Sequence, residues 1–212
     1  RIGIIGINGS GKSTLLKSIA QQLPPITGEL LQHPKTQIGY FSQHQVDMLD
    51  PSATAIAHLL NQDQRIEESK ARGYLGSFGF KSEQAFTPVE TFSGGEKARL
   101  ALALLIWQRP NILVMDEPTN HLDMFVREAL MVALQSFEGA VLLVSHDRYF
   151  LECCVNELWL VNHGTVTPYK GSLNDYAIAK QASMKTDAKT QTKEEKKSKP
   201  PSKDNKKLIA QL

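Results

Sequence analysis

The segment GINGSGKS, from Gly6 to Ser13, constrains the fold of this chain more than any other feature. It matches the pattern G-x-x-x-x-G-K-[ST], and it stands between an apolar run, residues 1–7, and a helical pattern of apolar residues, residues 11–23. Glycines allow backbone angles that are closed to other residues, so successive N–H groups can turn toward phosphate oxygens. The helix that follows adds its dipole. The segment therefore predicts a strand, a phosphate-binding loop and a helix in that order.

The loop residues are predicted to bind the phosphates of a nucleoside triphosphate, and this motif alone does not specify which one. Lys12 should reach the β- and γ-phosphates, and Ser13 should ligate Mg²⁺. A glycine-rich turn without a ligand is the alternative, and the complete motif in its strand–helix context disfavours it. The full set of predicted ATP- and phosphate-binding residues is Gly6, Ile7, Asn8, Gly9, Ser10, Gly11, Lys12, Ser13 and Thr14.

A second site pattern is NILVMDE, in which two carboxylates follow a buried apolar run. Asp116 occupies the position of a Walker B carboxylate and is predicted to hold Mg²⁺ through a water molecule. Glu117 comes next, where strand alternation would point its side chain away from that of Asp116. That orientation suits a base that polarises the attacking water. A pair of helix-capping acids is the alternative, and the phosphate loop upstream disfavours it.

The order of strand and helix patterns predicts an α/β fold with a mostly parallel sheet. Further buried strands are expected in NILVMDE and GAVLLVSHD, with a helix between them in DMFVREALMVALQSF. Ser93 and Glu96 form a capping-box pattern at the start of SGGEKARLALALLIWQ. Short strands are expected around Gly28, Pro34 and Gly39, and a hairpin is expected around residues 163–164. Residues 51–106 are predicted to form an inserted helical subdomain.

Charge divides the chain into a body, residues 1–179, and a tail, residues 180–212. The tail holds 10 lysines and 4 acidic residues, a net charge of +6, which leaves −4 for the body. The body is predicted to be one ATP-binding domain. The tail is predicted to be a disordered linker or a basic arm for a polyanion, and composition does not choose between the two.

Several bulk features point to the cytoplasm. No segment has the roughly 18 apolar residues in a row that a membrane helix needs, and the start lacks the features of a signal peptide. The two cysteines are sequence neighbours, which disfavours a disulfide between them. Because the chain begins inside a strand-like run and without Met, we expect it to be a piece of a longer protein.

The segment FSGGEKARLALALLIWQRPNILVMDEPTNHLD resembles the signature-to-Walker B region of ATP-binding cassette proteins, and the resemblance extends from residue 1 to about residue 175. It implies a P-loop NTPase cassette with a mostly parallel sheet core, a small antiparallel β part and an inserted helical subdomain.

The same resemblance assigns further site residues. Gln43 resembles the Q-loop glutamine, which contacts Mg²⁺, and His146 resembles the switch histidine, which acts in catalysis at the γ-phosphate. Asp123 resembles the D-loop aspartate at the seam with a second cassette. The signature loop, which acts on the ATP of the partner cassette, is matched by Ser93, Gly94, Gly95 and Glu96.

Details of these motifs favour one branch of the family. Glu96 stands where transporter cassettes usually carry Gln, and Asn120 and His121 lie within DEPTNHLD. With GSFGF, SHDRYFL and PYKGSLNDY, they make the chain similar to the second cassette of ABC-F proteins, most like the YheS-type bacterial group.

Membership in this branch implies a soluble two-cassette ATPase that binds the ribosome. In such a protein ATP closes the cassettes on rRNA and tRNA, and hydrolysis releases them. The alternative is the ATPase subunit of an ABC membrane transporter, which predicts a coupling-helix groove near the Q-loop.

Overall fold

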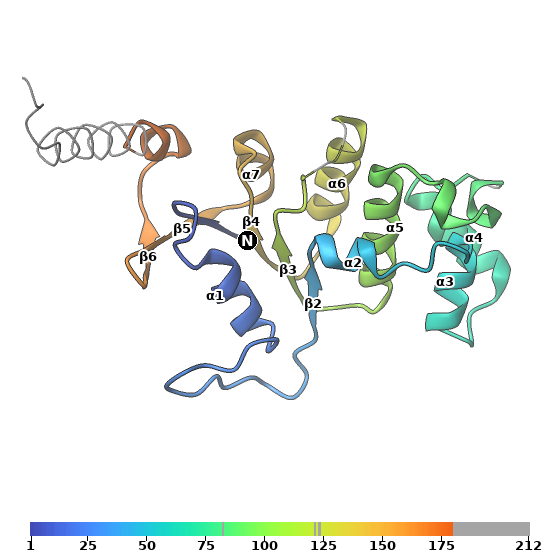
Figure 1. Ribbon diagram of the computed structural model, residues 1–212, viewed down its shortest axis with the longest axis horizontal. Coiled ribbons are helices and arrows are strands. Elements are labelled where there is room, and N and C mark those ends of the chain that lie inside the picture. The colour runs from blue at the N-terminus through green and yellow to red at the C-terminus, as the bar shows by residue number, and fades with distance from the viewer. Residues whose placement is uncertain (82, 121, 123, 180–212) are drawn as a thin grey trace, which may run out of the picture. The chain divides into compact units, whose positions relative to one another are not determined.

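The computed structural model describes residues 1–81, 83–120, 122 and 124–179, without the side chains of Gln43, Phe125 and Ala129. The chain divides into two compact units, Arg1–Lys170 and Gly171–Leu212. In the described part of the second unit, residues 173–179 are helical. The elements of the first unit (Figure 1) are, in order, β1 Ile2–Ile5, α1 Lys12–Ile19, β2 Ile38–Phe41, α2 Gln43–Asp47, α3 Ala55–Gln62, α4 Glu68–Ser77, η1 Gln84–Phe86, η2 Val89–Thr91, α5 Gly94–Trp107, β3 Ile112–Asp116, α6 Met124–Ser136, β4 Ala140–Val144, α7 Arg148–Cys154, β5 Glu157–Asn162 and β6 Thr165–Tyr169.

A single sheet organises the first unit, with the strand order β2-β3-β4-β1-β5-β6. All neighbouring strands are parallel except β5 and β6, which pair antiparallel. The prediction of a mostly parallel sheet with a small antiparallel part is confirmed. His163 and Gly164 both have positive φ, 46° and 73°, at the turn of the β5–β6 hairpin, as a tight two-residue turn requires.

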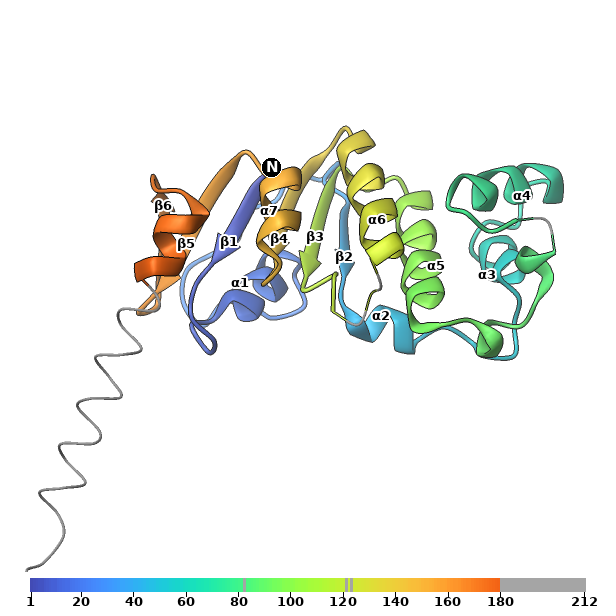
Figure 2. The same cartoon turned by 90° about the horizontal axis from the view of Figure 1, so that it is seen from above.

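Helices cover both faces of this sheet. On one face, Leu16 of α1 is fully buried and packs in one cluster with Ile4 and Val114. On the other face, a Cβ at Gly3 would lie 3.2 Å from Leu151 Cδ2 of α7, so this glycine lets helix and strand approach closely. Figure 1 shows α1 on one side of the sheet and α6 and α7 on the other, and Figure 2 gives the same arrangement from above.

The helical part between β2 and β3 has a core of its own. Phe80 and Phe92 stack with their ring centroids 5.6 Å apart, and Leu100 of α5 is fully buried against them. The remaining buried residues of this cluster are Ala55, Ile56, Leu59, Ala71, Leu75, Ala85, Val89 and Ala103. None of the helices in the described residues is long and apolar enough to cross a membrane.

Two predicted elements differ in the structure. The helix after the phosphate loop ends at Ile19 and does not reach residue 23, because Gln21 adopts φ 58° and Gln22 N–H returns to the Lys17 carbonyl. The strands expected around Gly28 and Pro34 are not formed, and only Ile38–Phe41 is extended. No described strand lies beside residues 28–34 to pair with them, and Leu31 there is 88% exposed.

The separate core of the helical part predicts a large effect of Phe80→Ala. Phe80 is 1% exposed, so the substitution should lower the free energy of unfolding by about 3–5 kcal/mol, through lost burial and a new cavity. Chemical denaturation would measure it. Phe86→Ala is the matched control, because Phe86 is 45% exposed and should cost less than about 1 kcal/mol. Equal losses in the two variants would contradict the packing described here.

Candidate functional site: a phosphate cradle beside an acidic strand end

The loop between β1 and α1 is shaped by its glycines. A Cβ at Gly6 would lie 2.5 Å from the Val161 carbonyl oxygen and 2.6 Å from Ser10 Oγ, so no side chain fits there. Gly9 and Gly11 adopt φ of 79° and 98°, a conformation that residues with a Cβ rarely take. Gly11 is also the N-cap of α1, so the unpaired N–H groups of the first helical turn face the loop. The loop is therefore built for an anion.

Lys12 lies inside this loop and is 9% exposed. Its Nζ donates to the carbonyl oxygens of Gly6 at 3.1 Å and Ile7 at 2.9 Å. Ser10 Oγ is buried and has no hydrogen-bond partner in the described part of the chain, which marks a polar position that a bound phosphate would satisfy. The other predicted phosphate-binding residues are exposed along the same loop and the first helical turn: Ile7, Asn8, Gly9, Ser13 and Thr14.

The loop meets the end of β3 through Ser13. Ser13 Oγ donates to Asp116 Oδ1 at 3.1 Å, although the two residues are 103 positions apart. A hydroxyl and a carboxylate side by side form an oxygen donor set that suits Mg²⁺, so these residues fit the predicted ion. Gln43, the third expected ligand, begins α2 directly after β2, which is the strand next to β3. Its side chain lies outside the described part of the structure.

Glu117 turns away from the strand that carries it. Its φ is 50°, and its N–H donates to the Val144 carbonyl of β4 at 2.9 Å. This left-handed conformation, rather than strand alternation, sets the direction of the side chain.

The Glu117 carboxylate faces the loop after β4. His146 N–H donates to Oε2 at 3.1 Å, and His146 Nε2 lies 3.3 Å from Oε1. The geometry of that second contact is not that of a hydrogen bond, and Oε1 is buried without a donor among the described residues. One carboxylate oxygen is thus anchored and the other is left to accept a proton donor.

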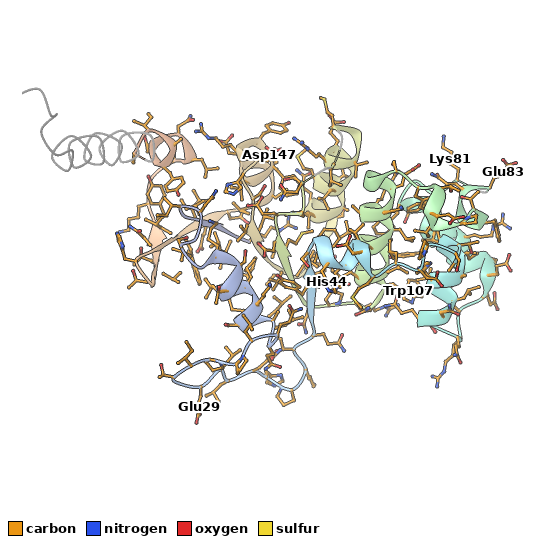
Figure 3. All side chains as sticks on the ribbon, in the orientation of Figure 1. Glu29, His44, Lys81, Glu83, Trp107 and Asp147 are labelled. Atoms are coloured by element: carbon orange, nitrogen blue, oxygen red, sulfur yellow. The ribbon has the colours of Figure 1, made fainter. Side chains whose placement is uncertain are left out.

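A second layer of contacts holds the loop that carries His146. Thr119 Oγ1 and Ser145 Oγ are both buried and 3.2 Å apart. Asp147, labelled in Figure 3, caps α7 by accepting from Phe150 N–H. Arg127 of α6 donates to Asp147 Oδ2 at 3.1 Å and to the Leu122 carbonyl at 3.1 Å. Sequence motifs did not indicate Arg127, because its contact with Asp147 depends on how α6 packs against α7.

The signature loop begins α5, in the helical part. Ser93 is the N-cap, and Gly94 and Gly95 open the helix. Ser93 N–H and Oγ donate to Glu96 Oε2, while Ser93 Oγ accepts from Glu96 N–H, so the predicted capping box is confirmed. Gln84 Nε2 donates to Glu96 Oε1. The partners of Glu96 therefore belong to the helical part, whereas the phosphate cradle is built on the sheet.

Two motif residues cannot be placed. Asp123, predicted to lie at the seam with a second cassette, falls outside the described residues, as does His121. Their neighbour Asn120 donates its N–H to the Glu117 carbonyl at 3.3 Å, so the chain turns immediately after the acidic pair.

Comparisons with known proteins agree with this architecture. Residues 1–120 match the family model described as ABC transporter. The chain is 49% identical over 176 residues to the probable ATP-binding protein YheS of Escherichia coli (strain K12), covering 83% of this chain and 28% of that protein. It is 43% identical over 176 residues to the ATP-binding cassette sub-family F member 3 of Mus musculus, covering 83% and 25%. The chain thus spans about a quarter of the length of these relatives.

Solved structures share the fold. The dimeric structure of a post-hydrolysis state of the ATP-binding cassette MJ0796 bound to ADP and Pi gives a TM-score of 0.63 at 23% identity, covering 80% of this chain and 85% of that one. The phosphate loop, the acidic end of β3 and the fold together define an ATP-binding cassette. The chain belongs to this family, and its relatives place it in the ABC-F branch.

The capping box makes a pH-dependent contribution to stability. Partial burial acts to raise the pKa of Glu96, but hydrogen bonds from Ser93 and Gln84 and the charge of Arg99 outweigh it and hold the pKa below its usual range. A carboxylate whose pKa is lower in the folded state than in the unfolded state stabilises the fold. This stabilisation is fully present above the unfolded-state pKa and is lost as the pH falls through the folded-state pKa.

We therefore expect Glu96→Gln to lower the free energy of unfolding by about 0.3–1 kcal/mol at pH 7, and the difference from wild type to fade in acid below about pH 4. Urea unfolding between pH 3 and pH 7 would measure it. Glu29→Gln, in the exposed loop before β2, controls for the loss of one negative charge. A Glu96→Gln difference that stays constant with pH would contradict this account.

Proposed function

We propose that this cassette binds ATP with Mg²⁺ in the loop between β1 and α1 and hydrolyses it at the end of β3. The backbone N–H groups of the loop bind the phosphates, and Lys12 exchanges its two carbonyl partners for β- and γ-phosphate oxygens. Ser13, Asp116 and Gln43 would hold the magnesium ion, with Asp116 acting through a water molecule. When bound, Mg²⁺ neutralises charge on the β- and γ-phosphate oxygens.

The observation that carries the hydrolytic step is the buried Glu117 oxygen Oε1, which accepts no hydrogen bond from the described residues. Oε2 is anchored by the His146 N–H, while Oε1 has no donor among the described residues. A water molecule attacking the γ-phosphate supplies that donor, and Glu117 accepts its proton as general base. His146, 3.3 Å from Oε1, stands beside the same water and contacts the γ-phosphate. The carboxylate is one residue from Asp116, so base and ion serve the same phosphate.

Glu117→Gln tests this assignment. The amide keeps the size of the side chain but cannot accept the proton, so kcat for ATP hydrolysis should fall by about 100-fold or more, while ATP binding is retained. Phosphate release and binding of a fluorescent ATP analogue would measure the two properties. Glu157→Gln, at an exposed glutamate at the start of β5, is the matched control. Hydrolysis at the wild-type rate in the Glu117 variant would exclude the residue as the base.

We further propose that the chain is the second cassette of a two-cassette ABC-F protein that works in the cytoplasm. Its curated relatives are roughly four times as long as the segment matched, which leaves room for another cassette. Ser93, Gly94, Gly95 and Glu96 would act on ATP held by that other cassette, and Asp123 would lie at the seam between the two. The separate placement of the signature loop on the helical part supports this division of labour.

Ribosome association is the third part of the proposal. ATP would hold the two cassettes closed on rRNA and tRNA, and hydrolysis would release them. The likeness to ABC-F relatives supports this role. The tail of residues 180–212, which lies outside the described residues, carries 10 lysines. Lysine clusters neutralise nucleic-acid phosphates and give salt-dependent binding.

Co-sedimentation with ribosomes tests the translation role. With ATP present, the Glu117→Gln protein should remain closed and move with ribosomes in a sucrose gradient, more strongly than wild type. A Lys12→Ala, Glu117→Gln double variant is the control, because it should fail to hold ATP and stay at the top. A Glu117→Gln protein that also stays at the top would overturn the ribosome assignment and leave the ATPase assignment intact.

One observation favours the alternative, an ATPase subunit of a membrane transporter. A cavity of about 780 Å³ lies between α5 and α6, and its lining includes Phe41, two residues before Gln43. The lining is largely apolar, with Leu102 and Val126 among the residues that contribute. A groove near the Q-loop is what a coupling helix would need. Recovery of the protein with membranes, and not with ribosomes, would favour this alternative.

A further inference from the structure

Tyr40 stands beside the acidic end of β3 without belonging to any nucleotide-binding motif. In the parallel pair β2–β3, Tyr40 is the partner of Val114. Side chains alternate along a strand, so Asp116, two residues after Val114, shares the face that Val114 and Tyr40 occupy. The strand register therefore brings the Tyr40 side chain to the carboxylate expected to hold magnesium.

The environment of Tyr40 makes its hydroxyl a dedicated hydrogen-bond donor. The residue is 7% exposed, and its neighbours in the cluster are Ile4, Leu16 and Val114, which offer the hydroxyl no polar atom. Its Oη donates to Asp116 Oδ2 at 3.3 Å. A phenol carries one O–H donor and is protonated at neutral pH, so the Tyr40 hydroxyl can donate to the carboxylate.

Asp116 consequently receives one hydroxyl on each oxygen. Ser13 donates to Oδ1 at 3.1 Å and Tyr40 to Oδ2 at 3.3 Å. Two donors on opposite oxygens fix the rotation of the carboxylate plane, which a single donor leaves free. Ser13 is itself an expected ligand of the ion. Tyr40 is not, so it can affect the ion only through its hydrogen bond to Asp116.

We propose that Tyr40 is a positioning residue for the magnesium site, which orients Asp116 and thereby raises the affinity of the nucleotide complex for the ion. This inference rests on the magnesium site of the proposed function. Partners that hydrogen-bond a direct metal ligand typically contribute about 10–100-fold to metal affinity. Asp116 is proposed to hold the ion through a water molecule, so Tyr40 lies one step further from the ion, and its bond is longer than the usual O–H···O distance. We therefore expect an effect at the lower end of that range.

Tyr40→Phe removes the hydroxyl and keeps the ring in the core. With the non-hydrolysable analogue AMPPNP bound, the dissociation constant for Mn²⁺, a paramagnetic substitute for Mg²⁺, should rise about tenfold. Electron paramagnetic resonance of the free Mn²⁺ measures it directly. AMPPNP affinity in EDTA should be unchanged, because the effect passes through the metal. For ATP hydrolysis, the Mg²⁺ concentration that gives half-maximal activity should rise by a larger factor than the factor by which kcat, measured at saturating Mg²⁺, falls.

Tyr74→Phe is the matched control. Tyr74 is also partly buried, and its hydroxyl donates to the Ala103 carbonyl at 2.7 Å within the helical part. Tyr74→Phe thus deletes the same hydroxyl at a position outside the site. The Mn²⁺ affinity should stay at the wild-type value, while the melting temperature of the nucleotide-free protein should fall. If Tyr40 had only a structural role, Tyr40→Phe would likewise lower the melting temperature and leave the Mn²⁺ affinity unchanged.

The outcomes are distinguishable. Unchanged Mn²⁺ affinity in Tyr40→Phe, with wild type binding the ion, overturns the positioning role and leaves the magnesium site standing. A tenfold loss in both tyrosine variants also overturns it, because the effect would then follow general destabilisation. A wild-type protein that retains no Mn²⁺ with AMPPNP overturns the magnesium site and the inference together.

Discussion

The hydrogen bond between Ser13 and Asp116 is the contact on which the site depends. It joins the first turn of α1 to the end of β3, across 103 positions of sequence. It can form because β1, β3 and β4 run parallel in one sheet, so their carboxyl ends reach the same edge. Ligands of open α/β sheets bind at that edge. The helical part between β2 and β3 lengthens the chain between these two residues without moving them apart.

Glu117, the proposed general base, is one of four non-glycine residues with positive φ in the described part of the chain. Glu117 has a φ of 50°, a conformation that costs about 1–2 kcal/mol for a residue with a side chain. Hydrogen bonds from its N–H to the Val144 carbonyl and from His146 N–H to its carboxylate hold it there. The strain turns the carboxylate off the strand and toward the loop after β4. If Glu117 were extended, its side chain would lie on the face of the sheet opposite to that of Asp116.

The first unit has two hydrophobic cores, and each holds one of the two motif-bearing loops. The cluster around Ile4, Leu16 and Val114 fixes the phosphate cradle to the sheet. The cluster around Phe80 and Phe92 fixes the start of α5 to the helical part. Each core is stabilised by its own burial of apolar surface. The start of α5 is therefore held by a different core from the one that holds the phosphate cradle, although both belong to the same compact unit.

The phosphate loop, the individual buried strands and the capping box at Ser93 could be predicted from the sequence, because each depends on residues close together in the chain. The predicted helix after the loop was too long, because the backbone turn at Gln21 leaves no local sequence pattern. The strands predicted before Ile38 were wrong, because no strand among the described residues lies beside them to pair. The left-handed turn at Glu117, the tie between Arg127 and Asp147, and the contact of Tyr40 with Asp116 were decided only by the tertiary structure. Each depends on strand register or helix packing, which brings together side chains that no spacing in the sequence relates.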